Sequence, residues 1–166
     1  MTEKKLVACH DLEGNTVNVP AAELNFRPSL YGVIIKEGKV LLAGYDDGWD
    51  YPGGGLHKGE TFDEAFTREI KEETGLSIAR GKLLDVASDF FTHPTDGHCQ
   101  TILLYFVGEY AGGEISTEYF DENEKVHGKK AEWFDIEQLH LMKFYNPLSP
   151  AQNQALARLA LEHKRI

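Results

Sequence analysis

The segment 62–74 constrains the fold of this 166-residue chain most strongly, because it carries the pattern of a helix with one buried face. Three large apolar side chains recur every four residues and form a stripe: Phe62, Phe66 and Ile70. Thr61 is placed to cap the N-terminus, Glu64 completes a capping box, and Gly75 marks the C-terminal stop. We therefore expect a helix over 62–74 that lies against the core.

Three glutamates lie on one side of this predicted helix. Glu69, Glu72 and Glu73 occupy positions i, i+3 and i+4, which span an arc of about 100°. They lie beside the apolar stripe, and we expect their carboxylates to converge on one point. Repulsion between such charges weakens a helix by roughly 0.2–0.5 kcal/mol per pair, and a bound cation would remove it. Carboxylate oxygens suit Mg²⁺ or Mn²⁺. The alternative is a solvated acidic face paired with Arg68 and Lys71.

A run of three glycines lies shortly before the helix, at Gly53, Gly54 and Gly55. Glycine allows the backbone to approach a ligand closely, and a glycine loop that leads into a helix N-terminus suits phosphate or metal contacts. Many ordinary turns also contain such a run. Its fixed distance from the glutamates makes these three residues candidates for substrate binding.

Taken in one frame, the glycines and glutamates follow a longer pattern. Gly54 is followed after five residues by Glu60, and after seven more by the run from Arg68 to Leu76. This segment resembles the Nudix box, G-x5-E-x7-R-E-U-x-E-E-x-G-U, where U is a bulky aliphatic residue, and every defined position matches. The sequences at 49–54 and 131–134 are also Nudix-like, so that the resemblance covers roughly residues 28–140.

The resemblance implies a fold and an activity. Nudix enzymes hydrolyse a nucleoside diphosphate linked to another moiety, and their fold is a mixed β-sheet packed between helices. By resemblance, the metal-binding and catalytic carboxylates are Glu69, Glu72 and Glu73. Arg68 would orient a neighbouring glutamate, Glu60 would support the box, and the Gly54 carbonyl would reach the metal, Mg²⁺ or alternatively Mn²⁺.

Elementary chemistry agrees with these implied roles. Water attacks a pyrophosphate poorly, and divalent ions neutralise phosphate oxygens and lower the pKa of a bound water. A carboxylate within hydrogen-bond reach then takes the proton of that water. The general base is either a box glutamate or a carboxylate of a later loop. Glu122 and Glu124 are the late candidates, and of the two we favour Glu124; a plain exposed acidic loop is the open alternative.

Further candidates for substrate binding lie outside the box. Trp49 and Tyr51 are placed to stack on a base or ring, although aromatics near a glycine loop also pack in cores. Arg27 precedes the first central strand and is either a phosphate contact or an ordinary surface arginine. The substrate is expected to be a small nucleotide, with oxidised nucleoside triphosphates, ADP-ribose and nucleotide sugars all open.

The remaining pattern predicts a layered fold of strands and few helices, α+β or α/β in class. Expected elements are a hairpin over 6–20, strands at 29–35, 39–44, 82–92, 100–110 and 130–134, a loop over 46–60, and helices at 135–140 and 149–164. We expect one domain over residues 1–166, with an N-terminal β-hairpin extension at 1–27 and a C-terminal helix at 148–166.

The composition narrows the function. The net charge of −10 and the lack of a basic patch argue against binding a nucleic acid polymer. The chain shows no membrane span and no signal peptide, so we expect a cytoplasmic monomer or homodimer. Two competing readings remain. One is an inactive Nudix module that senses a nucleotide, and the other is an isoprenoid diphosphate isomerase, for which Cys99 is the residue to check.

Overall fold

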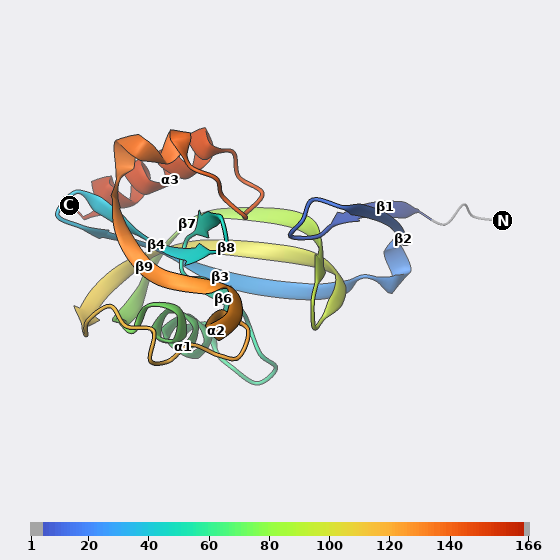
Figure 1. Ribbon diagram of the computed structural model, residues 1–166, viewed down its shortest axis with the longest axis horizontal. Coiled ribbons are helices and arrows are strands. Elements are labelled where there is room, and N and C mark those ends of the chain that lie inside the picture. Colours follow the sequence, from blue (N-terminus) through green and yellow to red (C-terminus); the bar gives the residue numbers. More distant parts are fainter. Residues whose placement is uncertain (1–4, 165–166) are drawn as a thin grey trace.

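A mixed β-sheet lies between helices on its two faces, as the sequence predicts, in the computed structural model that describes residues 5–164. Helices α1 (Phe62–Thr74) and α2 (Glu124–His127) cover one face, and α3 (Pro150–His163) covers the other (Figure 1). The hairpin of β1 (Leu6–His10) and β2 (Thr16–Pro20) extends from one end of the sheet. The α+β sandwich is therefore confirmed.

The other strands of the described residues are β3 (Asn25–Lys36), β4 (Lys39–Tyr45), β5 (Gly48–Asp50), β6 (Gly53–Gly55), β7 (Ser77–His93), β8 (Gly97–Gly112) and β9 (Gly128–Asp135). Two 3-10 turns are η1 (Ala21–Glu23) and η2 (Ile136–Leu141). The strand order is β2-β1-β7-β8-β3-β4-β5, with β6 paired to β3 and β9 paired to β4. The central pair β3 and β8 is parallel, whereas β7 and β8 are antiparallel.

The alternation of side chains along β3 separates the two cores. Leu30 and Ile34 face α1, while Val33 and Ile35 face α3. Gly32 lies on the α1 side, where an added Cβ would be only 2.6 Å from a side-chain carbon of Ile70. The missing side chain thus lets α1 approach the sheet closely, and this approach brings the box helix against the strands that carry the glycines.

The loop expected over 46–60 is wrong in part, because it contains two short strands. β6 pairs antiparallel with β3, placing Gly53 opposite Tyr31 and Gly55 opposite Ser29. Strand β5 pairs with the end of β4. These strands are held by backbone hydrogen bonds, and their glycine and aspartate composition gives no apolar alternation. The sequence pattern therefore did not reveal them.

Strands β7 and β8 are longer than expected. Their ladder runs from the pair Ser77–Gly112 to the pair His93–Gly97, with register shifts between Arg80 and Leu83. The irregular stretch breaks the alternation that strand prediction relies on.

The ends of the chain differ slightly from the expected divisions. β3 begins at Asn25, so residues 25–27 belong to the main sheet and not to the hairpin. Residues 1–4 and 165–166 of the expected domain lie outside the described residues. In the part of the chain that is described, no helix is long and apolar enough to cross a membrane.

Replacing Phe66 with alanine is expected to destabilise the protein by about 3–5 kcal/mol, because the ring is fully buried and packs edge-to-face on Phe106 at 6.0 Å. Phe62→Ala on the same helix is the matched control, since that ring is 43% exposed. Urea unfolding measures both free energies. Similar losses for the two variants would contradict the assigned packing of α1.

Candidate active site

Helix α1 and strand β6 face each other and carry the box residues. The helix begins after Thr61, whose hydroxyl accepts from the amide of Glu64 while the Glu64 carboxylate accepts from the amide of Thr61. It ends at Gly75, which is in the left-handed conformation. Both boundaries match the sequence prediction. One face of α1 is buried, and the neighbouring face points its glutamates toward Gly53–Gly55.

The guanidinium of Arg68 joins the two halves of the box. It donates to both carboxylate oxygens of Glu60, at 2.6 and 2.8 Å, and to the carbonyl of Gly55 at 3.2 Å. It also donates to Glu69 at 2.8 Å and to Glu72 at 3.3 Å. These bonds lower the pKa of Glu60 to about 2. Arg68 therefore joins the helix to the loop and is bonded to the neighbouring Glu69.

Glu69 lies directly against the glycine strand. A Cβ added at Gly54 would overlap a carboxylate oxygen of Glu69, so this carboxylate packs directly on the glycine backbone. Burial raises the pKa of Glu69, the hydrogen bond from Arg68 opposes the rise, and the charge of Glu72 adds to it.

Glu73 is buried and held from two sides. The hydroxyl of Tyr45 donates to its Oε1 at 2.6 Å, and the amide of Gly53 donates to its Oε2 at 2.8 Å. Burial raises the pKa of Glu73 well above its usual value, while these two bonds lower it and the charge of Glu124 raises it further. A Cβ at Gly53, where φ is 149°, would collide with the carbonyl of Leu30. Only glycine therefore fits where this amide reaches Glu73.

The late carboxylate that lies near the box is Glu124. It is 5% exposed, its carboxylate accepts from the amide of Asp121 at 2.8 Å, and its own amide donates to the Asp121 carboxylate at 2.7 Å. Burial raises the pKa of Glu124 to about 7, with further contributions from the charges of Asp121, Glu72 and Glu69.

Glu122 points elsewhere. Its side chain is 92% exposed and pairs with Lys125 at 2.6 Å. Of the two late candidates, therefore, Glu124 is the buried one whose charge acts on the box glutamates. The sequence showed an acidic loop here, whereas Glu124 begins the short helix α2.

The box glutamates do not converge on one point, which differs from the expectation. Glu69 turns toward Arg68, whereas Glu73 turns toward Tyr45 and Gly53. Among residues 5–164, no three acidic, histidine or cysteine side chains are spaced to hold a metal ion as they stand. Within the same range, no ion pair neutralises Glu73 or Glu124. This set of buried carboxylates, two of them without a cationic partner, fits a divalent cation.

Arg27 lies beside the glycine strand. Its guanidinium donates to Asp96 at 2.9 Å and to Ser29 at 2.8 Å. A Cβ at Gly55 would be 2.8 Å from its Nη2 atom. The side chain is only 21% exposed, so the alternative of an ordinary surface arginine does not describe it.

The two aromatic candidates differ in their burial. Tyr51 is 1% exposed and its hydroxyl donates to the carbonyl of Asn153 at 2.7 Å, so the packing alternative accounts for it. The ring of Trp49 is partly buried and packs edge-to-face on Phe134 at 4.6 Å. Cys99 is fully buried and burial raises the pKa of its thiol, which disfavours the isomerase reading because a reactive cysteine needs a lowered pKa.

Sequence reasoning missed Tyr45, which bonds Glu73. The residue follows an apolar strand and precedes two aspartates, and nothing in that pattern marks it as a contact of residue 73. Only the register of β4 against the rest of the sheet brings the two together.

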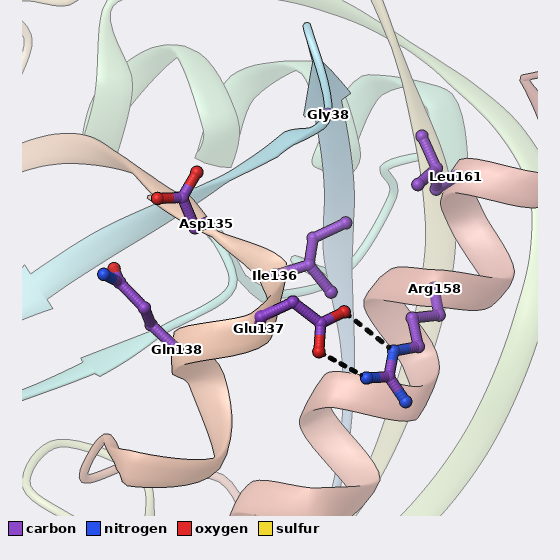
Figure 2. Close-up of a pocket in the computed structure, with 7 residues that line it drawn as sticks. All are labelled: Gly38, Asp135, Ile136, Glu137, Gln138, Arg158 and Leu161. Atoms are coloured by element: carbon purple, nitrogen blue, oxygen red, sulfur yellow. Dashed lines mark hydrogen bonds and ion pairs between the residues drawn. The ribbon is translucent and has the colours of Figure 1, made fainter.

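A surface pocket of about 430 Å³ lies away from these residues. It is formed by the β3–β4 turn, η2 and α3, and an ion pair between Glu137 and Arg158 is part of its lining (Figure 2). None of the predicted site residues lines it. The box residues lie on the opposite, α1 side of the sheet.

The comparisons with known proteins agree with this geometry. The family model of the NUDIX domain matches residues 26–159, and the chain belongs to the Nudix family. It is 36% identical over 118 residues to an ADP-ribose pyrophosphatase of Methanocaldococcus jannaschii, covering 68% of this chain and 64% of that protein. It is 38% identical over 77 residues to an RNA pyrophosphohydrolase of Hydrogenovibrio crunogenus, covering 44% and 46%.

A solved structure shares the fold. The MutT protein from Methanosarcina mazei Go1 superposes with a TM-score of 0.61 at 22% identity, covering 87% of this chain and 99% of that one. The chain spans less than two thirds of the length of both curated relatives named above. Membership of the family and the fold are thus established.

Asp50, beside the aromatic candidates, is expected to make stability depend on pH. It accepts from the Asn146 side chain and from the Tyr51 amide, both at 2.7 Å, but burial raises its pKa to about 7. The pKa of Asp50 is about 3.9 in the unfolded state. Between about pH 4 and pH 7, therefore, the native state binds one more proton than the unfolded state. The contribution of this protonation to the free energy of unfolding is complete below about pH 4 and is lost as the pH rises through about 7.

Asp50→Asn keeps an acceptor oxygen and removes this titration. The difference in unfolding free energy, variant minus parent, should rise by on the order of 2 kcal/mol from pH 5 to pH 8. Urea unfolding at the two pH values provides the measurement. A constant difference between variant and parent would show that Asp50 is ionised throughout.

Proposed function

We propose that the chain is a divalent-cation-dependent pyrophosphohydrolase that cleaves a phosphate anhydride in a nucleoside diphosphate linked to another moiety. The observation that carries the proposal is the set of buried, mutually repelling carboxylates beside a glycine strand. A purely structural cluster would bury this much charge only with cationic partners. Among residues 5–164, the cationic side chain paired with the box glutamates is that of Arg68, which is already bonded to Glu60.

The residues that would hold the cation are Glu69, Glu72, Glu73 and the Gly54 carbonyl. Mg²⁺ is the expected ion, with Mn²⁺ as an alternative, because all these donors are hard oxygens. When bound, the cation neutralises phosphate oxygens and lowers the pKa of a water.

The protein residues supply the remaining functions. Glu124 has a pKa of about 7 and is suited to take a proton from the attacking water at neutral pH. The absence of side chains at Gly53–Gly55 lets the Glu69 carboxylate and the Arg27 guanidinium lie directly against this backbone. Arg27, against Gly55, is placed to contact a phosphate oxygen. Arg68 holds the frame and stays paired with Glu60.

The substrate we propose is a small nucleotide of the ADP-ribose type. Support comes from the Methanocaldococcus jannaschii relative, whose name is that of an ADP-ribose pyrophosphatase. The Hydrogenovibrio crunogenus relative is named for RNA, so a 5′-phosphorylated RNA belongs in the assay panel beside ADP-ribose, a nucleotide sugar and a nucleoside triphosphate. Fastest turnover of the RNA would overturn the expectation that no nucleic acid polymer is bound.

Glu72→Gln is expected to lower kcat/KM by roughly 100-fold or more, because it removes a ligand charge from the most exposed box glutamate. Phosphate or mononucleotide release with Mg²⁺ measures the effect. Asp63→Asn on the same helix is the control, since its carboxylate is 73% exposed, and its activity should stay within about twofold. Binding of a nucleotide without turnover by the parent protein would favour the sensing module instead.

Glu124→Gln tests the general base against its neighbour. We expect a loss of roughly 10²–10⁴ in kcat and loss of the acidic limb of the pH–rate profile. Glu122→Gln, two residues away and exposed, should match the parent in both. Equal activity of the two variants would assign the base to a box glutamate.

A further inference from the structure

Tyr45 contacts the box from outside it. It ends strand β4, and its hydroxyl donates to Oε1 of Glu73 at 2.6 Å. This is a short bond to an ionisable acceptor, of the kind that is stronger than a bond between neutral groups. It joins a strand to the helix across 28 residues of sequence.

Tyr45 and Gly53 together fix both oxygens of Glu73. The amide of Gly53 donates to Oε2 at 2.8 Å, from strand β6. A carboxylate held at both oxygens keeps one orientation, while each oxygen retains a further lone pair for another partner. The two donors therefore orient Glu73 without filling its acceptor capacity.

The Tyr45 hydroxyl is a neutral donor, which suits a carboxylate that is to bind a cation. A lysine or arginine at this place would fix the carboxylate but would also cancel its charge. A tyrosine hydroxyl, with an ordinary pKa of about 10, donates a hydrogen bond while keeping its proton and brings no positive charge to compete with a cation.

The position of Tyr45 relates it to the second acidic element. Tyr45 pairs with Gly128, which directly follows α2, and the next amide, of Asp46, donates to the carbonyl of His127 at 3.0 Å. Helix α2 carries Glu124. The end of β4 is thus bonded both to α1, through Glu73, and to the segment that places Glu124.

We propose that Tyr45 is a positioning residue that holds Glu73 in the orientation required to bind the divalent cation. The proposal rests on the proposed function, in which Glu73 is a cation ligand. Tyr45, which lies outside the box, thus preorganises Glu73, a metal ligand that lies inside it.

Tyr45→Phe removes the hydroxyl and keeps the ring. We expect the dissociation constant for Mn²⁺, measured in the absence of substrate from the electron paramagnetic resonance of free Mn²⁺, to rise about tenfold, since loss of an outer partner costs 10–100-fold in affinity. At saturating Mg²⁺, kcat should fall while KM changes less than twofold. Tyr45→4-aminophenylalanine, which keeps an N–H donor, should recover most of the affinity.

Tyr105→Phe is the matched control. Tyr105 is fully buried on the α3 side, and within residues 5–164 its hydroxyl has no hydrogen-bond partner. Loss of that hydroxyl should leave Mn²⁺ affinity unchanged. Urea unfolding of each variant verifies that it is folded before binding is compared.

Two results separate the proposal from the function on which it rests. If Glu73→Gln weakens Mn²⁺ binding but Tyr45→Phe does not, the positioning role is wrong and the metal site stands. If Glu73→Gln binds Mn²⁺ like the parent, the ligand assignment itself fails. Equal weakening by Tyr45→Phe and its aminophenylalanine counterpart would also overturn the role of the donor.

Discussion

The ion pair between Arg68 and Glu60 is the interaction on which the site depends. Its two hydrogen bonds, at 2.6 and 2.8 Å, tie the middle of α1 to the loop that precedes it. The same guanidinium reaches the carbonyl of Gly55, so the helix is also fixed to the glycine strand. A lysine would not replace it, because only the planar guanidinium offers several donors in a fixed geometry.

This arrangement leaves one arginine to serve several carboxylates. Arg68 is shared by Glu60, Glu69 and Glu72, whereas Glu73 depends on the neutral donors Tyr45 and Gly53. Burying carboxylates without full compensation costs stability, and the raised pKa values of Glu69 and Glu73 express that cost. A fold that served only its own stability would replace such groups with apolar ones. The cation binding proposed above accounts for their presence.

The sequence predicted the parts of the molecule that follow local patterns. The boundaries of α1 were predictable because its caps and its apolar stripe are written in adjacent residues. The position of the glycine run relative to the glutamates was predictable from the family pattern. By contrast, β6 was hidden, because its three glycines pair through the backbone and carry no side-chain signal.

Local sequence patterns do not predict the contacts that are made across the sheet. The bond of Tyr45 to Glu73 depends on the register of β4, β9 and β6, which no spacing in the sequence encodes. The choice between Glu122 and Glu124 depends on the short helix α2, which turns one carboxylate inward and leaves the other in solvent. Two residues apart in an acidic run, they look alike until the backbone is known.

The features that local sequence patterns predict concern the reaction, whereas those that they miss concern the choice of substrate. The box residues lie in one continuous segment, so their spacing alone specifies the hydrolytic frame. The surfaces around that segment come from distant parts of the chain, such as Arg27 on β3 and Asp96 on the β7–β8 turn, which bond at 2.9 Å. Substitutions in these strand ends and turns would leave in place the caps and packing of the helix that carries the carboxylates.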